Sequence, residues 1–219
     1  MSVATPRVIK EVLKDIENAL TELRKIEMLR DETGVSTITT GANLFDISYA
    51  TKNETSSILY DNNISYSFLI DKLLFNRQYT ILLYDKSIVQ AEFKIANNII
   101  IKERLLFIKK HNKTWQKDEI AEYENEYEEW FDDDFGIPIF FRVDYDPDAF
   151  KEVSHPATHF TLSNQENCRI PIKGIITFSE FMKLIMKQFY NIDLSITQYR
   201  YNDETITNNE KKLIHMNWV

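Results

Sequence analysis

Apolar residues recur at steps of three and four close to the start of the chain, which is the spacing of one face of a helix. The pattern predicts a helix over residues 6–30. Thr5 is in position to cap this helix, Pro6 suits its first turn, and Gly34 suits the role of terminator beyond its end. We expect the helix to pack on the protein's own domain, and pairing with a partner helix is the alternative.

The chain between residues 35 and 108 reads mainly as β structure, because β-branched and alternating apolar runs are separated by short polar breaks. The runs predict strands over residues 35–40, 45–49, 79–84, 88–95 and 99–108. The last three runs follow one another closely, so they predict an antiparallel meander. Helical spacing over residues 66–75 adds a short helix between strands.

The alternation of apolar and polar residues returns after residue 138. Residues 139–145 predict a strand that places Arg142 and Asp144 on one face and apolar side chains on the other. Shorter strands are expected over residues 160–162, 168–172 and 213–218. The helical run at 177–190 differs from them, because Thr177 and the glutamate three residues later have the spacing of a capping box.

These elements predict an α+β fold, in which a mostly antiparallel sheet carries the N-terminal helix and the helix at 177–190. At 219 residues and 43% hydrophobic composition, the chain suits a single domain over 1–219 that includes an N-terminal helical part at 1–34. Only 4 glycines and 5 prolines argue against long flexible linkers and against a glycine-rich nucleotide-binding fold.

The net charge of −8 is unevenly distributed. Residues 117–134 hold ten carboxylates and one lysine, a local charge of −9, so the remainder carries −8 minus −9, or +1. Aromatic residues fall at helical spacing among these acids, which predicts an acidic helical insertion over 116–135. The insertion is open to three interpretations: a solvated excursion, a docking surface for a basic protein partner, or a decoy of nucleic-acid charge.

Reactive side chains are concentrated between residues 140 and 172. His155 and His159 suit proton transfer, Arg142 and Arg169 suit the charge of a phosphate, and Asp144 suits the orientation of an imidazole. These groups together are what phosphodiester cleavage uses. They are equally what a buried polar network uses to tie strands together, so both interpretations stay open.

The spacing of the two histidines decides whether they can act together. In an extended segment their rings would lie roughly 13 Å apart, at about 3.3 Å per residue, so they converge only if the chain bends near Pro156. A zinc site built from both histidines, Cys168 and an aspartate is a further alternative, although no paired-cysteine spacing supports it. Cys168 acting as a nucleophile beside Arg169 is the last alternative, against a buried structural thiol.

This window resembles the bacterial family of unknown function called DUF2290. The resemblance rests on R-x-D-Y-D, H-P-x-x-H and N-C-R-I-P blocks followed by a helix that ends F-Y, which here are residues 142–146, 155–159, 167–171 and 181–190. Residues 100–107 also resemble the strand that precedes the family's variable middle, so the likeness covers roughly 75–190. Ser163 replaces a family glycine. R-x-D followed by H-P-x-x-H is loosely similar to TumE-like toxins, over a shorter stretch.

The resemblance implies no established activity, and the likeness to toxins favours a toxin–antitoxin or phage-defence effector that acts on RNA or DNA. The rival hypothesis is a non-enzymatic subunit that binds a protein partner through residues 117–134. No cofactor is expected. A single cysteine and the lack of an apolar run of about 18 residues favour a cytoplasmic protein without a membrane partner. The oligomeric state is left open.

Overall fold

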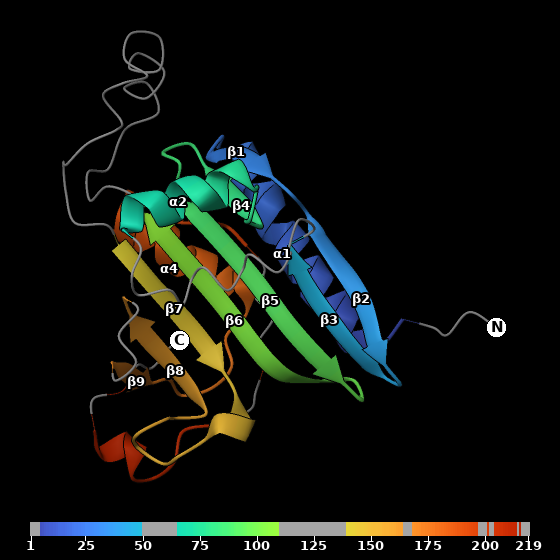
Figure 1. Ribbon diagram of the computed structural model, residues 1–219, viewed down its shortest axis with the longest axis vertical. Coiled ribbons are helices and arrows are strands. Elements are labelled where there is room, and N and C mark those ends of the chain that lie inside the picture. The colour runs from blue at the N-terminus through green and yellow to red at the C-terminus, as the bar shows by residue number, and fades with distance from the viewer. Residues whose placement is uncertain are drawn as a thin grey trace, which may run out of the picture.

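The computed structural model describes residues 5–49, 65–109, 139–163, 168–196, 201, 204–213 and 215. Within these residues, nine strands form one antiparallel sheet with helices on both faces, so the predicted α+β fold is confirmed (Figure 1). The predicted acidic insertion at 116–135 and most of the predicted strand at 213–218 lie outside the described residues. None of the described helices is long and apolar enough to cross a membrane.

The strands pair in the order β1-β4-β5-β6-β7-β8-β9, while β3 also pairs with β5 and β2 pairs with β3. Their bounds are β1 Leu29–Glu32, β2 Val35–Gly41, β3 Leu44–Tyr49, β4 Ile81–Leu83, β5 Ile88–Ala96, β6 Ile99–Lys109, β7 Ile139–Tyr145, β8 Thr158–Leu162 and β9 Arg169–Pro171. The predicted meander is β4, β5 and β6. Strand β7 extends it, because every neighbouring pair from β4 to β7 is antiparallel.

Helix α1 (Arg7–Lys25) buries one face, which includes Val12, Ile16 and Leu23, against the sheet. The predicted boundaries of this helix are wrong at both ends. Pro6 itself precedes the first turn without any side-chain cap, so Thr5 does not cap the helix.

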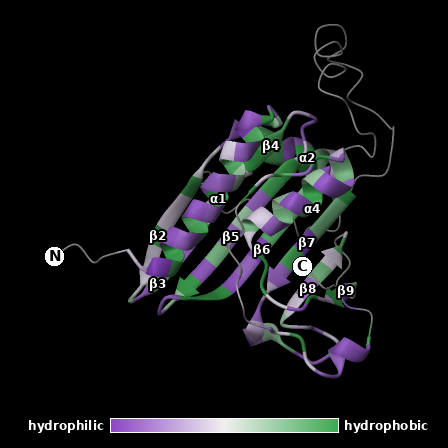
Figure 2. Ribbon diagram, turned by 180° about the vertical axis from the view of Figure 1, so that it is seen from behind, coloured by the Kyte–Doolittle hydropathy of each residue, from purple (hydrophilic) through white to green (hydrophobic). Residues whose placement is uncertain are grey.

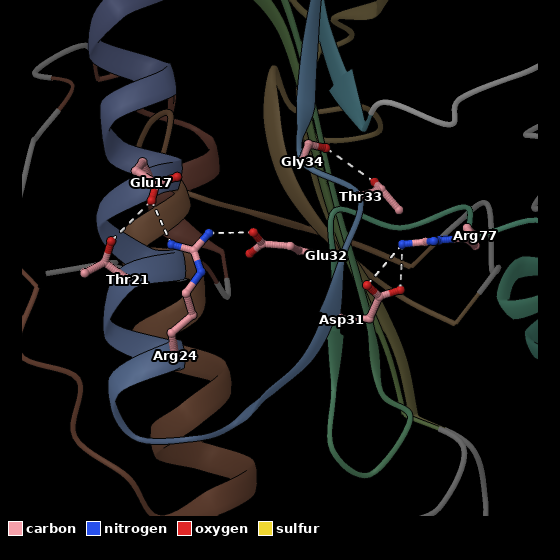
Figure 3. A network of polar contacts seen from close by, with 8 residues as sticks. All are labelled: Glu17, Thr21, Arg24, Asp31, Glu32, Thr33, Gly34 and Arg77. Atoms are coloured by element: carbon pink, nitrogen blue, oxygen red, sulfur yellow. Dashed lines mark hydrogen bonds and ion pairs between the residues drawn. The ribbon is translucent and has the colours of Figure 1, made fainter.

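The helix ends at Lys25, because Glu27 adopts a left-handed φ of 57°. The residues that follow, from Leu29 on, form β1, which pairs with β4. Gly34 also has a left-handed φ, 70°, but it lies between β1 and β2 rather than at the helix end. Ion pairs hold β1 to both neighbours: Arg24 of α1 lies 2.6 Å from Glu32, and Arg77 lies 2.9 Å from Asp31 (Figure 3).

Helix α4 (Phe178–Tyr190) lies beside α1 on the same face of the sheet, as seen from behind in Figure 2. Its predicted capping box is confirmed, since Thr177 and Glu180 bond each other's backbone N–H groups. A hydrogen bond also joins the two helices: the backbone N–H of Ser179 in α4 donates to the carboxylate of Asp15 in α1 at 3.1 Å. Apolar side chains from α1, α4 and this face of the sheet make the larger core.

Helix α2 (Tyr66–Phe75), capped by Ser65, crosses the opposite face near one end of the strands (Figure 1). Beneath it, Leu106, Ile108 and Phe140 belong to a second apolar cluster. Further along the same face, away from α2, the strands present charged and polar side chains instead. One face of β6 and β7 is therefore apolar core at one end and a polar surface at the other.

Candidate functional site

The polar surface brings together all five residues that the sequence singled out. Asp144 on β7 lies directly opposite His159 on β8. Arg142 lies opposite Thr161, which lies opposite Arg169 on β9. Because side chains two apart on a strand share a face, the strand residues of this set point to the face that carries α2, over the part of that face that α2 leaves uncovered. We call Arg104, Arg142, Asp144, His155, His159 and Arg169 the histidine–arginine cluster.

The two histidine rings meet because the chain bends at Ala157, which lies between them, just before it enters β8. Lys151 and His155 exchange backbone hydrogen bonds of 2.9 and 2.7 Å, which closes a tight loop around Val153 with its left-handed φ of 68°. The ring centroids of His155 and His159 are 4.9 Å apart at an interplanar angle of 86°. The bend that convergence required is therefore present.

His159 is buried, with 2% of its surface exposed, and its ring is fixed from both sides. Nδ1 lies 2.8 Å from the carbonyl oxygen of Pro156, and because a carbonyl only accepts, Nδ1 carries the hydrogen. Nε2 faces Oδ2 of Asp144 at 3.8 Å. Burial lowers the pKa of His159 despite that carboxylate, so the ring is neutral near pH 7 and Nε2 bears the lone pair.

His155 is the more accessible member of the pair, since it is only half-buried. Desolvation lowers its pKa, and the positive charge of Arg169 lowers it further. A neutral imidazole at the solvent boundary, backed by a second imidazole, is a suitable proton acceptor at neutral pH.

Asp144 connects the histidines to two arginines. Its Oδ1 accepts a hydrogen bond of 3.0 Å from Nε of Arg104, and its Oδ2 accepts one from Nε of Arg142. Burial opposes ionisation of this carboxyl, but the two guanidiniums outweigh burial and hold the pKa of Asp144 below its usual value. Asp144 therefore stays charged and fixes both arginines against the sheet.

Sequence reasoning missed Arg104, which lies on β6 opposite Asp144. The alternation of the strand at 99–108 could have placed Arg104 on the polar face. The pairing of that strand with the one at 139–145, across a long intervening segment, was not visible in the sequence.

Arg169 differs from the other arginines of the cluster. Within the described part of the chain it forms no ion pair, and its buried Nε has no hydrogen-bond partner. Its charge still reaches both histidines, because it lowers the pKa of His155 and of His159. A guanidinium that has no carboxylate partner among the described residues, and that lies beside two neutral imidazoles, is a place where an anion is favoured.

The neighbouring cations are balanced by carboxylates. Lys102 lies 3.0 Å from Asp146 and Lys94 lies 3.8 Å from Asp46. Asp146 also accepts a hydrogen bond of 3.2 Å from the backbone N–H of Asp148. A polar hollow of about 150 Å³ lies among these groups and borders the cluster at Arg104 and Asp144. The surface beside the cluster is thus polar but close to neutral.

The zinc alternative that includes Cys168 receives no support from the geometry of the described residues, whereas its role as a nucleophile stays a prediction. Cys168 is a free, partly exposed thiol just before β9. Across the described ranges, no group of three or more histidine, cysteine, aspartate or glutamate side chains is arranged to hold a metal ion. The zinc set proposed from the sequence is therefore not assembled in this part of the chain.

The fold and the cluster define an α+β protein with a single antiparallel sheet and a histidine–arginine surface on one face. The chain belongs to the family described as "Uncharacterized conserved protein (DUF2290)", whose model matches residues 29–218. The family resemblance predicted from the sequence is confirmed, and the match extends beyond the 75–190 expected. No curated protein and no solved structure matches the chain. The looser likeness to TumE-like toxins stays a prediction.

Proposed function

We propose that the histidine–arginine cluster binds and cleaves a phosphodiester of RNA or DNA, and that the protein is an effector of toxin–antitoxin or phage-defence type. The observation that carries the proposal is the contact between His155 and His159 next to the guanidinium of Arg169, whose Nε has no hydrogen-bond partner among the described residues. Proton-transfer groups and an anion-binding group thereby share one surface, as phosphodiester cleavage requires.

Different residues of the cluster transfer the proton, stabilise the phosphate charge and position these groups. His155, which is the accessible imidazole, takes the proton of the attacking hydroxyl as the new P–O bond forms. The bond to the leaving oxygen then breaks, and that oxygen receives a proton from the imidazolium or from water. Arg169 and Arg142 stabilise the charge that develops on the non-bridging oxygens. Asp144 and His159 are positioning residues, since Asp144 holds Arg142 and His159 supports the ring of His155.

The test is cleavage of labelled RNA and DNA oligonucleotides by purified protein. His155→Ala is expected to lower the rate by about 100-fold or more, the usual contribution of a positioned general base. Arg169→Gln is expected to raise KM more than it changes kcat. His215→Ala is the matched control, because His215 is exposed and contacts the Leu213 carbonyl rather than the cluster. Wild-type protein that cleaves neither substrate, or a fully active His155→Ala variant, would overturn the proposal.

One observation favours a second candidate, a non-enzymatic subunit that binds a protein partner through residues 117–134. Lys94, Lys102, Arg104 and Arg142 are each paired with a carboxylate on this face, as in a network that only ties strands together. Deleting residues 117–134 separates the two candidates. The subunit hypothesis expects loss of partner capture in cells, whereas the effector hypothesis expects unchanged cleavage by the purified protein.

A further inference from the structure

The rim of a β-sheet presents unpaired N–H and C=O groups that can bind another strand, and proteins usually protect it with short strands, charges or proline. In this sheet β9 forms one rim, and it has only three residues, including Arg169 and Pro171. The opposite rim begins with β1, whose Asp31 and Glu32 are held in ion pairs and whose pairing with β4 is interrupted by a bulge (Figure 3). Both of these rims are protected.

The strand β2 is the exception. It follows β1 through Gly34, which has a left-handed φ, and runs along the outside of the sheet (Figure 1). Among the described strands it pairs only with β3. Its seven residues, Val35–Gly41, contain no charge and no proline, and they are rich in β-branched side chains. Residues 37–41 are exposed, and Ile38 exposes 56% of its surface.

We propose that β2 is a dimerisation edge, on which β2 of a second copy pairs in antiparallel orientation about a two-fold axis close to Ile38. The partner is a second copy because the strand is complementary to itself. Pairing about Ile38 sets Thr37 against Thr39 and Ser36 against Thr40, so neutral and β-branched side chains meet and no like charges oppose one another. The sheet then continues across two molecules.

The strength of this dimer follows from the size of the edge. A single seven-residue strand buries less surface than a permanent interface, so the dimer is weak and depends on concentration. Each chain carries a net charge of −8, so the two copies repel one another at long range. Added salt screens this repulsion and strengthens the dimer, which is the opposite of the effect on an interface made of ion pairs.

Sedimentation velocity on the purified full-length chain tests the proposal. Wild type is expected to move from monomer toward dimer between about 5 and about 200 μM. Ile38→Lys places a charge on the edge and is expected to leave a monomer across this range. Ile99→Lys is the matched control, because Ile99 is a comparably exposed isoleucine, at 61%, at the first position of β6 and away from β2. A monomeric wild type, or Ile38→Lys that dimerises as wild type does, would overturn the proposal.

Cross-linking provides a second measurement that does not depend on introducing charge. In a Cys168→Ser background, which removes the only cysteine of the chain, Ile38→Cys is expected to form a disulfide-linked dimer under mild oxidation. Ile99→Cys in the same background is expected to stay monomeric. Equal cross-linking of both variants would contradict the edge. Neither experiment measures cleavage, so the outcome is independent of the proposed activity.

Discussion

Asp144 and His159 face each other across β7 and β8, with Oδ2 of the carboxylate 3.8 Å from Nε2 of the imidazole. The carboxylate is already engaged by Arg142 and Arg104, so it does not draw a proton onto the ring. Burial instead keeps His159 neutral, and its pKa lies below the ordinary value. The pair therefore places a charged carboxylate beside an uncharged imidazole, and both side chains are buried.

The lowered pKa of His159 makes stability depend on pH on the acidic side. Below about pH 6.5 the unfolded chain binds a proton at this position that the native state does not yet bind. The free energy of unfolding therefore falls as the pH drops from about 6.5 toward the native pKa. Urea unfolding of His159→Gln and wild type at several pH values checks this, and the variant should show the weaker dependence. Parallel pH profiles would contradict the assignment.

Removal of the Asp144 carboxylate should destabilise the protein strongly. Asp144→Ala leaves Arg142 and Arg104 without their shared partner in a largely buried setting, and loss of one member of a buried ion pair costs about 3–5 kcal/mol. Asp193→Ala is the control, since Asp193 pairs with Lys187 on the exposed surface, where such pairs contribute at most about 1 kcal/mol. Chemical denaturation measures both. Equal losses for the two variants would show that the Asp144 network contributes little.

The buried carboxyl of Glu103 should have the opposite effect, because it makes the free energy of unfolding fall as the pH rises. This carboxyl is 3% exposed on the helix-covered face of β6. Burial raises its pKa well above the ordinary value, and the negative charges of Glu180 and Asp15 raise it further. The native state therefore holds a proton that the unfolded chain loses above about pH 4.5.

Stability is consequently lost as the pH rises from about 4.5 toward the native pKa of Glu103. Glu103→Gln imitates the protonated form at every pH. Its unfolding free energy, relative to wild type, should therefore increase between about pH 5 and about pH 8. Thermal unfolding at both pH values gives the comparison. A constant difference would mean that Glu103 ionises normally in the native state.

The two long helices differ at their N-termini in a way that mutation can measure. Thr177→Ala removes the side-chain cap of α4 and should cost about 1 kcal/mol of stability, the typical contribution of such a cap. Thr5→Ala should leave stability unchanged, because no side chain caps α1. A comparable loss for both variants in urea unfolding would restore the original prediction that Thr5 caps the first helix.

Residue periodicity predicted most of the elements, because long one-sided patterns survive in the folded state. The helix at 177–190 and the strand at 139–145 are examples, since each has one apolar face and a clear signal at its start or in its alternation. The end of the first helix was not predictable in this way. Residues 29–32 fit a helix or a strand locally, and pairing with β4 selects the strand.

The candidate site was predictable in its residue types but not in its connections. The motif residues cluster in the sequence, so they could be found without a structure. Arg104 could not be connected to them from sequence, because its partner Asp144 lies 40 residues away. Lys109 and Asp85 show the same limit more clearly: they lie 24 residues apart in the sequence, yet each side chain is 2% exposed and they form a buried ion pair.

The division of β7 into two chemically distinct faces limits how this protein can vary. Arg142 and Asp144 alternate along the strand with the core residues Phe141 and Val143. Inserting or deleting one residue in this strand would exchange the two sets, burying charges beneath α4 and exposing phenylalanine to water. Homologues should therefore tolerate many substitutions in β7 but show no change in its length.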